Sequence, residues 1–165
     1  MKSLSSRQSP VGDSASLHVS VQESDFDTAQ LQRALLSGDS AEGAVATFTG
    51  YVRKRNLDLA VETLTLEHYP GMTESSILDT LSKACERWPV LAGSVVHRVG
   101  RLSCGDQIVW VGISAAHRGD AFAACEFVMD YLKTRAPFWK KEEGPNGSRW
   151  LDAREEDTLK ASAWE

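Results

Sequence analysis

Residues 94–114, SVVHRVGRLSCGDQIVWVGIS, contain the pattern that decides the fold class. Ser94 to Val99 and Gln107 to Ser114 are rich in valine and isoleucine and predict two strands. The turn sequence Ser103-Cys104-Gly105-Asp106 lies between them. Neighbouring strands joined by so short a connection favour an antiparallel hairpin over a doubly wound parallel sheet.

The segments on either side of this pair alternate strands with helices. Period-two alternation or β-prone composition predicts strands at 17–21, 43–52, 60–69 and 150–151. Capping residues and Gly or Pro stops predict three helices. The first begins after Ser24, Asp25 or Asp27 and ends at Gly38, the second runs from Thr73 to Pro89, and the third begins near Gly119 or Asp120 and ends before Pro137. A polar loop is expected at 142–148. The prediction is an α+β fold, with a mixed or antiparallel sheet and three main helices.

Length and composition fit one globular domain. The chain has 165 residues, of which 42% are hydrophobic and 25% charged. We expect residues 1–16 to form a mobile tail, residues 17–154 a single catalytic domain, and residues 155–165 a charged C-terminal tail. The net charge of −5 argues against a nucleic-acid or membrane-surface binder. No apolar run approaches the length of a membrane span.

The three cysteines, Cys85, Cys104 and Cys125, fit neither a disulfide framework nor a zinc site. Cysteines that form no disulfide framework favour a reducing compartment, so a cytoplasmic location is expected. Cys85 and Cys125 fall on apolar helix stripes, where a small core residue is the simpler interpretation. Cys104 lies in a turn with no visible base. No phosphate-binding loop, paired histidines or nucleophile elbow is present, so no metal or cofactor is expected.

Cations gather in three places despite the acidic balance: Arg53-Lys54-Arg55, His117-Arg118, and the group Lys133, Arg135, Lys140 and Lys141. Solvated surface clusters are the simpler interpretation of each. Two of these positions favour a role in a binding site over a place on the solvated surface. Lys133 falls at the edge of the apolar arc that begins at Phe122, so it either extends to water or lines a cleft. His117-Arg118 precedes a helix start, where free N–H groups suit an anion.

Several long motifs together resemble one family, the large catalytic subunit of molybdopterin synthase. They are Phe48-Thr49-Gly50 with Val52, Arg53 and Asn56; residues 64–72, LTLEHYPGM; Ala116-His117-Arg118; and residues 129–140, MDYLKTRAPFWK. The resemblance runs from about Val19 to Arg154. It implies an α/β-hammerhead type of fold, and a homodimer that binds two small ubiquitin-like sulfur-carrier subunits in a 2:2 heterotetramer.

The implied reaction moves sulfur from the C-terminal Gly-Gly thiocarboxylate of the carrier to cyclic pyranopterin monophosphate, and two rounds build the dithiolene of molybdopterin. By motif position, the resemblance makes Lys133 and Lys140 the active-site lysines. It assigns substrate binding to Tyr51, Val52, Arg53, His117, Arg118, Lys141 and Glu142. Arg154 matches an arginine that reaches the neighbouring protomer's site. Tyr51 departs from the basic residue of some relatives.

An ordinary lysine is a poor base at neutral pH. Crowding Lys133 with other cations in a partly dry cleft would lower its pKa and suit it to proton transfer, or to stabilising an oxyanion, with Lys140 assisting. Two alternatives stay open. One is a catalytically inactive homologue that scaffolds a complex; the intact lysines argue against it. The other is a module that binds a different phosphate ligand or single-stranded RNA, which the acidic balance disfavours.

Overall fold

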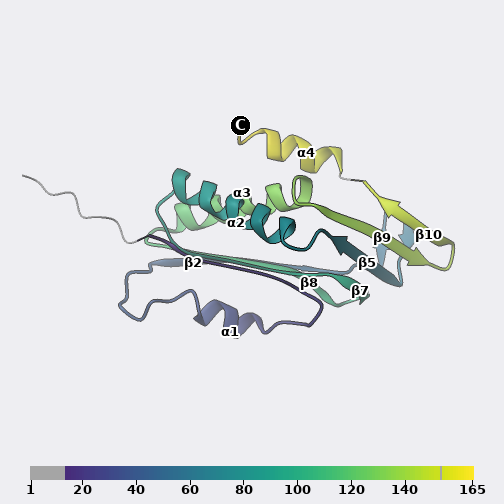
Figure 1. Ribbon diagram of the computed structural model, residues 1–165, viewed down its shortest axis with the longest axis horizontal. Coiled ribbons are helices and arrows are strands. Elements are labelled where there is room, and N and C mark those ends of the chain that lie inside the picture. The colour runs from purple at the N-terminus through teal and green to yellow at the C-terminus, as the bar shows by residue number, and fades with distance from the viewer. Residues whose placement is uncertain (1–13, 153) are drawn as a thin grey trace, which may run out of the picture.

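A four-stranded sheet with helices on both faces forms the larger layer of the molecule (Figure 1). The computed structural model describes residues 14–152 and 154–165. The strand order is β1 (Ser16–Gln22), β6 (Val90–Arg98), β8 (Gln107–Ala115) and β2 (Ala44–Tyr51). β1 pairs with β6 in parallel, and β8 is antiparallel to both of its neighbours. The antiparallel pairing predicted within residues 94–114 is confirmed.

Helices α2 (Met72–Arg87) and α3 (Arg118–Thr134) cover one face of this sheet, and the short α1 (Thr28–Arg33) covers the other (Figure 1). Both faces of β8 are therefore buried. Val111 and Ile113 pack in the core with α2 and α3, whereas Trp110 packs with Leu35 beside α1. Burial on both sides explains why β8 has a near-continuous apolar run rather than a clean alternation.

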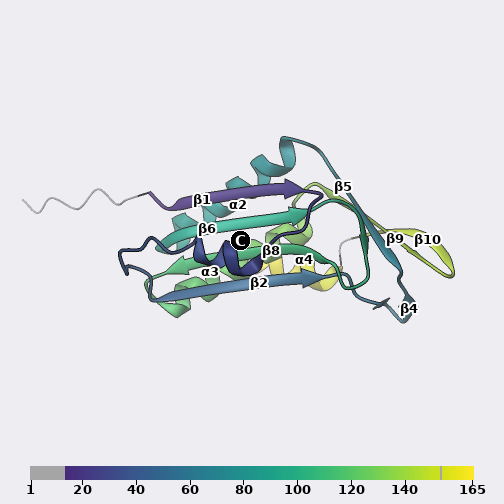
Figure 2. The same cartoon turned by 90° about the horizontal axis from the view of Figure 1, so that it is seen from below.

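A second, fully antiparallel sheet lies beyond one end of the first (Figure 2). Its order is β10 (Gly147–Leu151), β9 (Phe138–Gly144), β5 (Thr63–His68) and β7 (Gly100–Ser103). A small core of Leu64, Leu66 and Leu102 supports it. A two-stranded ribbon, β3 (Arg55–Asn56) with β4 (Leu59–Ala60), projects beside this sheet.

The α+β fold is confirmed, and three elements differ from the sequence prediction. The connection between β6 and β8 contains β7, which leaves the first sheet and joins the second. The polar loop predicted at 142–148 is the β9–β10 hairpin. The charged segment after residue 154 contains a fourth helix, α4 (Glu155–Ser162). Of the predicted N-terminal tail, residues 1–13 lie outside the described residues and Ser16 begins β1.

Helix α4 lies over α3 and is fixed by the residues that follow it (Figure 1). The Trp164 indole packs edge-on against Trp88 and Phe127, at centroid distances of 5.5 and 5.7 Å. Its Nε1 donates a hydrogen bond of 2.7 Å to Oδ2 of Asp130. This anchoring holds the C-terminal end of α4 against α3, and the Nζ atom of Lys133 lies 3.8 Å from Oδ2 of Asp157 at its start.

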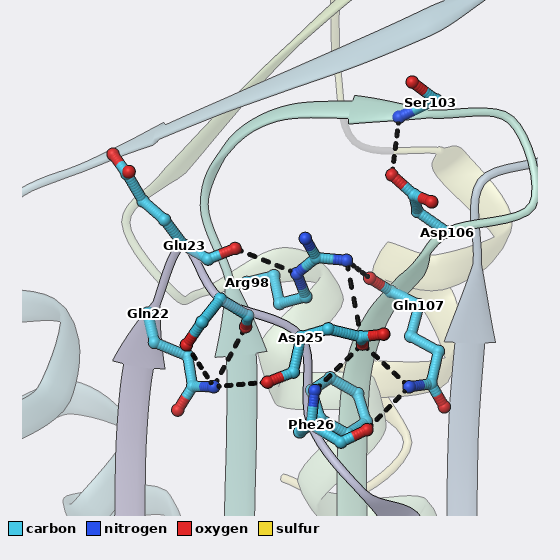
Figure 3. Close-up of polar contacts among 9 residues, drawn as sticks. Gln22, Glu23, Asp25, Phe26, Arg98, Ser103, Asp106 and Gln107 are labelled. Atoms are coloured by element: carbon cyan, nitrogen blue, oxygen red, sulfur yellow. Dashed lines mark hydrogen bonds and ion pairs between the residues drawn. The ribbon is translucent and has the colours of Figure 1, made fainter.

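A polar network fixes the ends of β6 and β8 against the segment that follows β1 (Figure 3). Arg98 donates to the carbonyl oxygens of Glu23 and Gln107, each at 3.1 Å. The Gln107 amide donates to Oδ1 of Asp25 at 2.8 Å, which lowers the pKa of that carboxyl group. Gln107 is paired with Tyr51 across the β2–β8 register. The network therefore supports the strand ends from which the pocket described next is built.

Candidate active site

A pocket of about 550 Å³ lies where the second sheet meets the C-terminal end of α3 and the first turn of α4. The strand β2 and the residues after it supply one wall, and β9 and β10 supply another. Five cations line it: Arg53, Lys133, Lys140, Arg149 and Arg154. Three carboxylates, Glu142, Asp152 and Asp157, accompany them. Although the whole chain is acidic, its pocket carries an excess of positive charge.

Seven of the ten site residues expected from the sequence line this pocket: Tyr51, Val52, Arg53, Lys133, Lys140, Glu142 and Arg154. They come from four separate parts of the chain. Strand β9 shows how the fold directs such residues into the pocket. Alternate residues of a strand share a face, so Phe138, Lys140 and Glu142 all point toward the cavity. Lys141 does not line the pocket; its ammonium lies near Glu143 and over the Trp150 ring.

Lys133 lies at the rim of the pocket, near the end of α3. Its side chain is 45% exposed, and its Nζ is 3.8 Å from Oδ2 of Asp157. The placement at the edge of the buried face is confirmed, although Phe122, the expected start of the apolar arc, is itself 67% exposed. The buried face of α3 is instead made by Ala121, Ala124, Cys125, Phe127, Val128 and Leu132.

Lys140 is the half-buried lysine of the pair. Burial lowers the pKa of its ammonium, the nearby Lys133 lowers it further, and Asp157 opposes the change. Beside it on β9, Phe138 stacks on His97 with ring centroids 3.9 Å apart. Burial lowers the pKa of His97 to about 3, so this imidazole is neutral at neutral pH. The sequence predicts a lowered pKa at Lys133; the structure shows one at Lys140, which the buried rings help to keep dry.

A hydrogen-bonded network built on Asn56 crosses the floor of the pocket. Oδ1 of Asn56 accepts from Arg154 at 2.6 Å and from Arg53 at 3.4 Å. Its Nδ2 donates to Oε1 of Glu142 at 2.6 Å. Arg149 donates from two nitrogens to Oε2 of the same carboxylate, at 2.9 and 3.2 Å. Glu142 is thereby fully engaged, which explains how a carboxylate is buried here.

Two expected site residues, His117 and Arg118, lie outside this pocket. His117 is the N-cap of α3 and Arg118 is its first residue, whereas Lys133 is near its last. At 1.5 Å per residue, the helix separates them from Lys133 by about 25 Å. Both side chains are exposed. A single chain therefore does not unite these residues with the lysines.

The cysteines are poorly placed to act as nucleophiles. Burial raises the pKa of Cys125 to about 11 and also raises that of Cys85. Both pack in or against the main core. Cys104 is closer to the pocket, and its Sγ donates to the carbonyl oxygen of Val61 at 2.6 Å. Among the described residues, no group of His, Cys, Asp and Glu side chains could hold a metal ion.

The sequence interpretation does not assign Asn56, Arg149 or Asp157 to the site, and the structure places all three in the pocket wall. Asn56 lies three residues after Arg53 in one of the motifs that carry the family resemblance, and this position was the sequence signal that could have identified it as a site residue. Arg149 lies between the predicted loop at 142–148 and the predicted strand at 150–151, and Asp157 lies in the predicted charged tail. Their role depends on pairing with residues distant in the chain.

Known proteins resemble this chain in both fold and sequence. The family model described as "MoaE protein" matches residues 21–135. A molybdopterin synthase catalytic subunit from Vibrio cholerae is 58% identical over 147 residues, which cover 89% of this chain and 97% of that protein. The chain belongs to the MoaE family. This family contains the molybdopterin synthase catalytic subunits, so the resemblance in the sequence is confirmed.

Solved structures of the MoaE family agree with the fold. The MoaE protein from Burkholderia ambifaria matches with a TM-score of 0.75 at 50% identity, covering 92% of this chain and 98% of that one. A complex of subunits 1 and 2 of molybdopterin-converting factor from Helicobacter pylori matches with a TM-score of 0.67 at 21% identity, covering 82% and 91%. At that identity the second match supports the fold alone. No helix in the described part of this MoaE chain is long and apolar enough to cross a membrane.

Proposed function

We propose that this MoaE-family chain transfers sulfur from the C-terminal thiocarboxylate of a small ubiquitin-like carrier subunit to cyclic pyranopterin monophosphate. The observation that carries the proposal is the cationic pocket that contains both Lys133 and Lys140. Its substrates are an anionic phosphate ester and an anionic C-terminus, and clustered guanidinium and ammonium groups bind such anions. In each round the thiocarboxylate sulfur forms a bond to a carbon of the pterin side chain, and water then hydrolyses the resulting thioester. The sulfur stays on the pterin and the carrier leaves with an ordinary carboxylate, so one dithiolene consumes two loaded carriers.

The two lysines suit different steps. The lowered pKa of Lys140 increases the fraction of neutral amine near neutral pH, so Lys140 is the group that transfers protons. Lys133, at the rim and beside Asp157, supplies positive charge to the oxyanion that forms when water attacks the carbonyl of the carrier–pterin thioester. Arg53 and Arg154 hold the phosphate. No thiol of this chain is required, because the carrier brings the sulfur.

The carrier and the second copy complete the assembly. The carrier docks on this fold with its C-terminal tail in the cationic pocket, as the family resemblance implies. We further propose a homodimer in which His117 and Arg118 of a second copy reach the pocket, since about 25 Å of helix keeps those of the same chain away. The resemblance predicts that Arg154 crosses to the neighbouring protomer, whereas the structure has it bonded to Asn56 of its own chain. The whole is a 2:2 heterotetramer, and its free cysteines fit the cytoplasm.

Reconstitution tests the function. The full chain is mixed with thiocarboxylated carrier and cyclic pyranopterin monophosphate, and the dithiolene product is measured. We expect product only when all three components are present, and the same yield from Cys104→Ser. Binding of carrier and pterin without any product would instead favour the inactive scaffold. Loss of chemistry in a folded Cys104→Ser variant would show that this chain supplies a sulfur nucleophile.

A further inference from the structure

Asn56 occupies an unusual position between the arginines of the pocket. Its side chain is buried, with 9% exposed, at the end of the short strand β3. One amide oxygen accepts hydrogen bonds from both Arg53 and Arg154. The amide nitrogen is used by Glu142 and the backbone oxygen by Arg149, at 3.3 Å. The side-chain amide is therefore fixed in one orientation, with its oxygen toward the two arginines.

The charge of the hydrogen-bond acceptor determines whether the two arginines keep their positive charge for a ligand. Two guanidinium groups repel each other, and an acceptor shared by both lowers the cost of holding them close. A carboxylate would do so by cancelling one positive charge, whereas the Asn56 amide is neutral. Among the described residues neither Arg53 nor Arg154 forms an ion pair, whereas Arg149 is neutralised by Glu142. Both charges of the pair therefore remain available to a ligand.

We propose that Asn56 is a positioning residue that holds Arg53 and Arg154 as one two-guanidinium site for a doubly charged tetrahedral anion. The inference rests on the proposed function only in taking that anion to be the pterin's phosphate, which gains its second negative charge when the cyclic diester opens to a monoester. Asn56 acts through the arginines and does not touch the reacting atoms. Replacing its amide with a carboxylate of the same shape should remove the site without emptying the space.

Sulfate is the probe, because it remains a dianion from pH 6 to pH 8 and so does not itself titrate. It is titrated into the full-length chain by calorimetry, in the absence of carrier and pterin. We expect Asn56→Asp to weaken sulfate binding by about tenfold or more at pH 8, since the new carboxylate neutralises the arginines. The chain's other asparagine, the exposed Asn146 in the β9–β10 turn, provides the matched control. Asn146→Asp adds the same charge and should change binding by less than about twofold.

The pH dependence separates positioning from simple structural support. In Asn56→Asp the new carboxyl group would lie against Oε1 of Glu142, so the two would share a proton as the pH falls. Sulfate binding by this variant should recover between pH 8 and pH 6, whereas Asn146→Asp should show the wild-type profile. A loss of binding that is the same at both pH values, with wild-type thermal stability, would overturn the proposal.

A double-mutant cycle of Asn56→Ala and Arg154→Ala tests the proposal if Asn56→Asp does not fold. We expect Arg154→Ala to weaken sulfate about tenfold in the wild type and less than about threefold in Asn56→Ala. Additive effects would overturn the proposal, as would absence of sulfate binding by the wild type. Turnover in the reconstituted system is measured separately. A chain that makes dithiolene but shows additive effects has the proposed function without this site, and one that shows the coupling without turnover has the site without the function.

Discussion

The Nζ atom of Lys133 lies 3.8 Å from Oδ2 of Asp157, and this contact joins the last turn of α3 to the first turn of α4. The pair is partly exposed, so it adds little to stability. Its value lies in position, because it keeps a cation directed at the pocket mouth. Lys140, deeper in the same cavity, has no ion pair among the described residues. The two lysines therefore respond differently to substitution.

Replacing Lys133 with alanine should leave the fold intact and reduce sulfur transfer by about 10²-fold or more, since the residue is exposed and its loss uncovers no core. Thermal unfolding and single-turnover product formation measure the two effects. Lys83→Ala is the control, because Lys83 forms an analogous ion pair with Asp79 on α2, outside the pocket. A Lys133→Ala variant with wild-type turnover would exclude Lys133 from the chemistry.

Arginine substitutions distinguish a charge from a proton carrier. Arginine keeps its positive charge and does not release a proton near neutral pH. Lys133→Arg should therefore retain turnover within about tenfold of the wild type, whereas Lys140→Arg should lose about 10²-fold or more. The reverse ranking would transfer the proton-carrying role to Lys133.

Lys140→Met should stabilise the folded chain while abolishing turnover. The pKa of Lys140 is lowered below its usual 10.5, so the charged side chain costs stability below the folded pKa. That cost is relieved as the pH rises toward 10.5. The gain from Lys140→Met should therefore be largest near pH 7 and should shrink toward pH 10, as followed by urea unfolding. Lys141→Met removes a contact with Glu143 on the opposite face and should give no such gain.

Complementation tests the shared site. Lys133→Ala protein is mixed with Arg118→Ala protein, and subunit exchange is verified by mass spectrometry. If Arg118 acts across the dimer, each mixed dimer has one intact pocket, and about a quarter of wild-type activity should return. The matched mixture of Lys133→Ala with Arg154→Ala should stay inactive, because the structure places Arg154 in the same chain's pocket as Lys133. Recovery only in the second mixture would show that Arg154 is the residue that crosses.

The turn that follows Asn56 stores backbone strain. Leu57 and Asp58 have φ values of 50° and 64°, and together they connect β3 to β4 as a two-residue hairpin loop. This left-handed conformation suits Asn and Gly and is costly for leucine. Leu57→Asn should raise the free energy of unfolding by about 1 kcal/mol. Leu59→Asn, at the start of β4, should bring no gain, and equal effects of the two variants would contradict the strain.

Local patterns predict the parts of this fold whose partners are close in sequence or whose burial is one-sided. Ile77 and Leu81 on α2 are fully buried, as helical spacing predicts, and the rim position of Lys133 follows from its place on the helix. Phe122 shows the limit, because the apolar face of α3 is set by the sheet beneath it and not by hydrophobicity alone. Strand β9 is missed because its four charged residues, 140–143, are consecutive and show no alternation of polar with apolar side chains. The bonds of Asn56 to Glu142 and Arg154 join residues 86 and 98 positions apart, so they cannot be inferred from local pattern.

Helix α4 belongs to a less stable part of the molecule than the central sheet. Its N-cap Arg154 and its first-turn residue Asp157 line the pocket, yet its only buried residue within Glu155–Ser162 is Ala161, and the Trp164 indole and the partly exposed Lys133–Asp157 contact complete its attachment. Such a peripheral unit opens at a lower free energy than the central sheet unfolds. Heating should therefore dismantle the pocket while the sheet is still intact, so inactivation precedes melting. We therefore expect the upper temperature limit for activity to depend on how firmly α4 is attached, and to respond less to changes in the core of the central sheet.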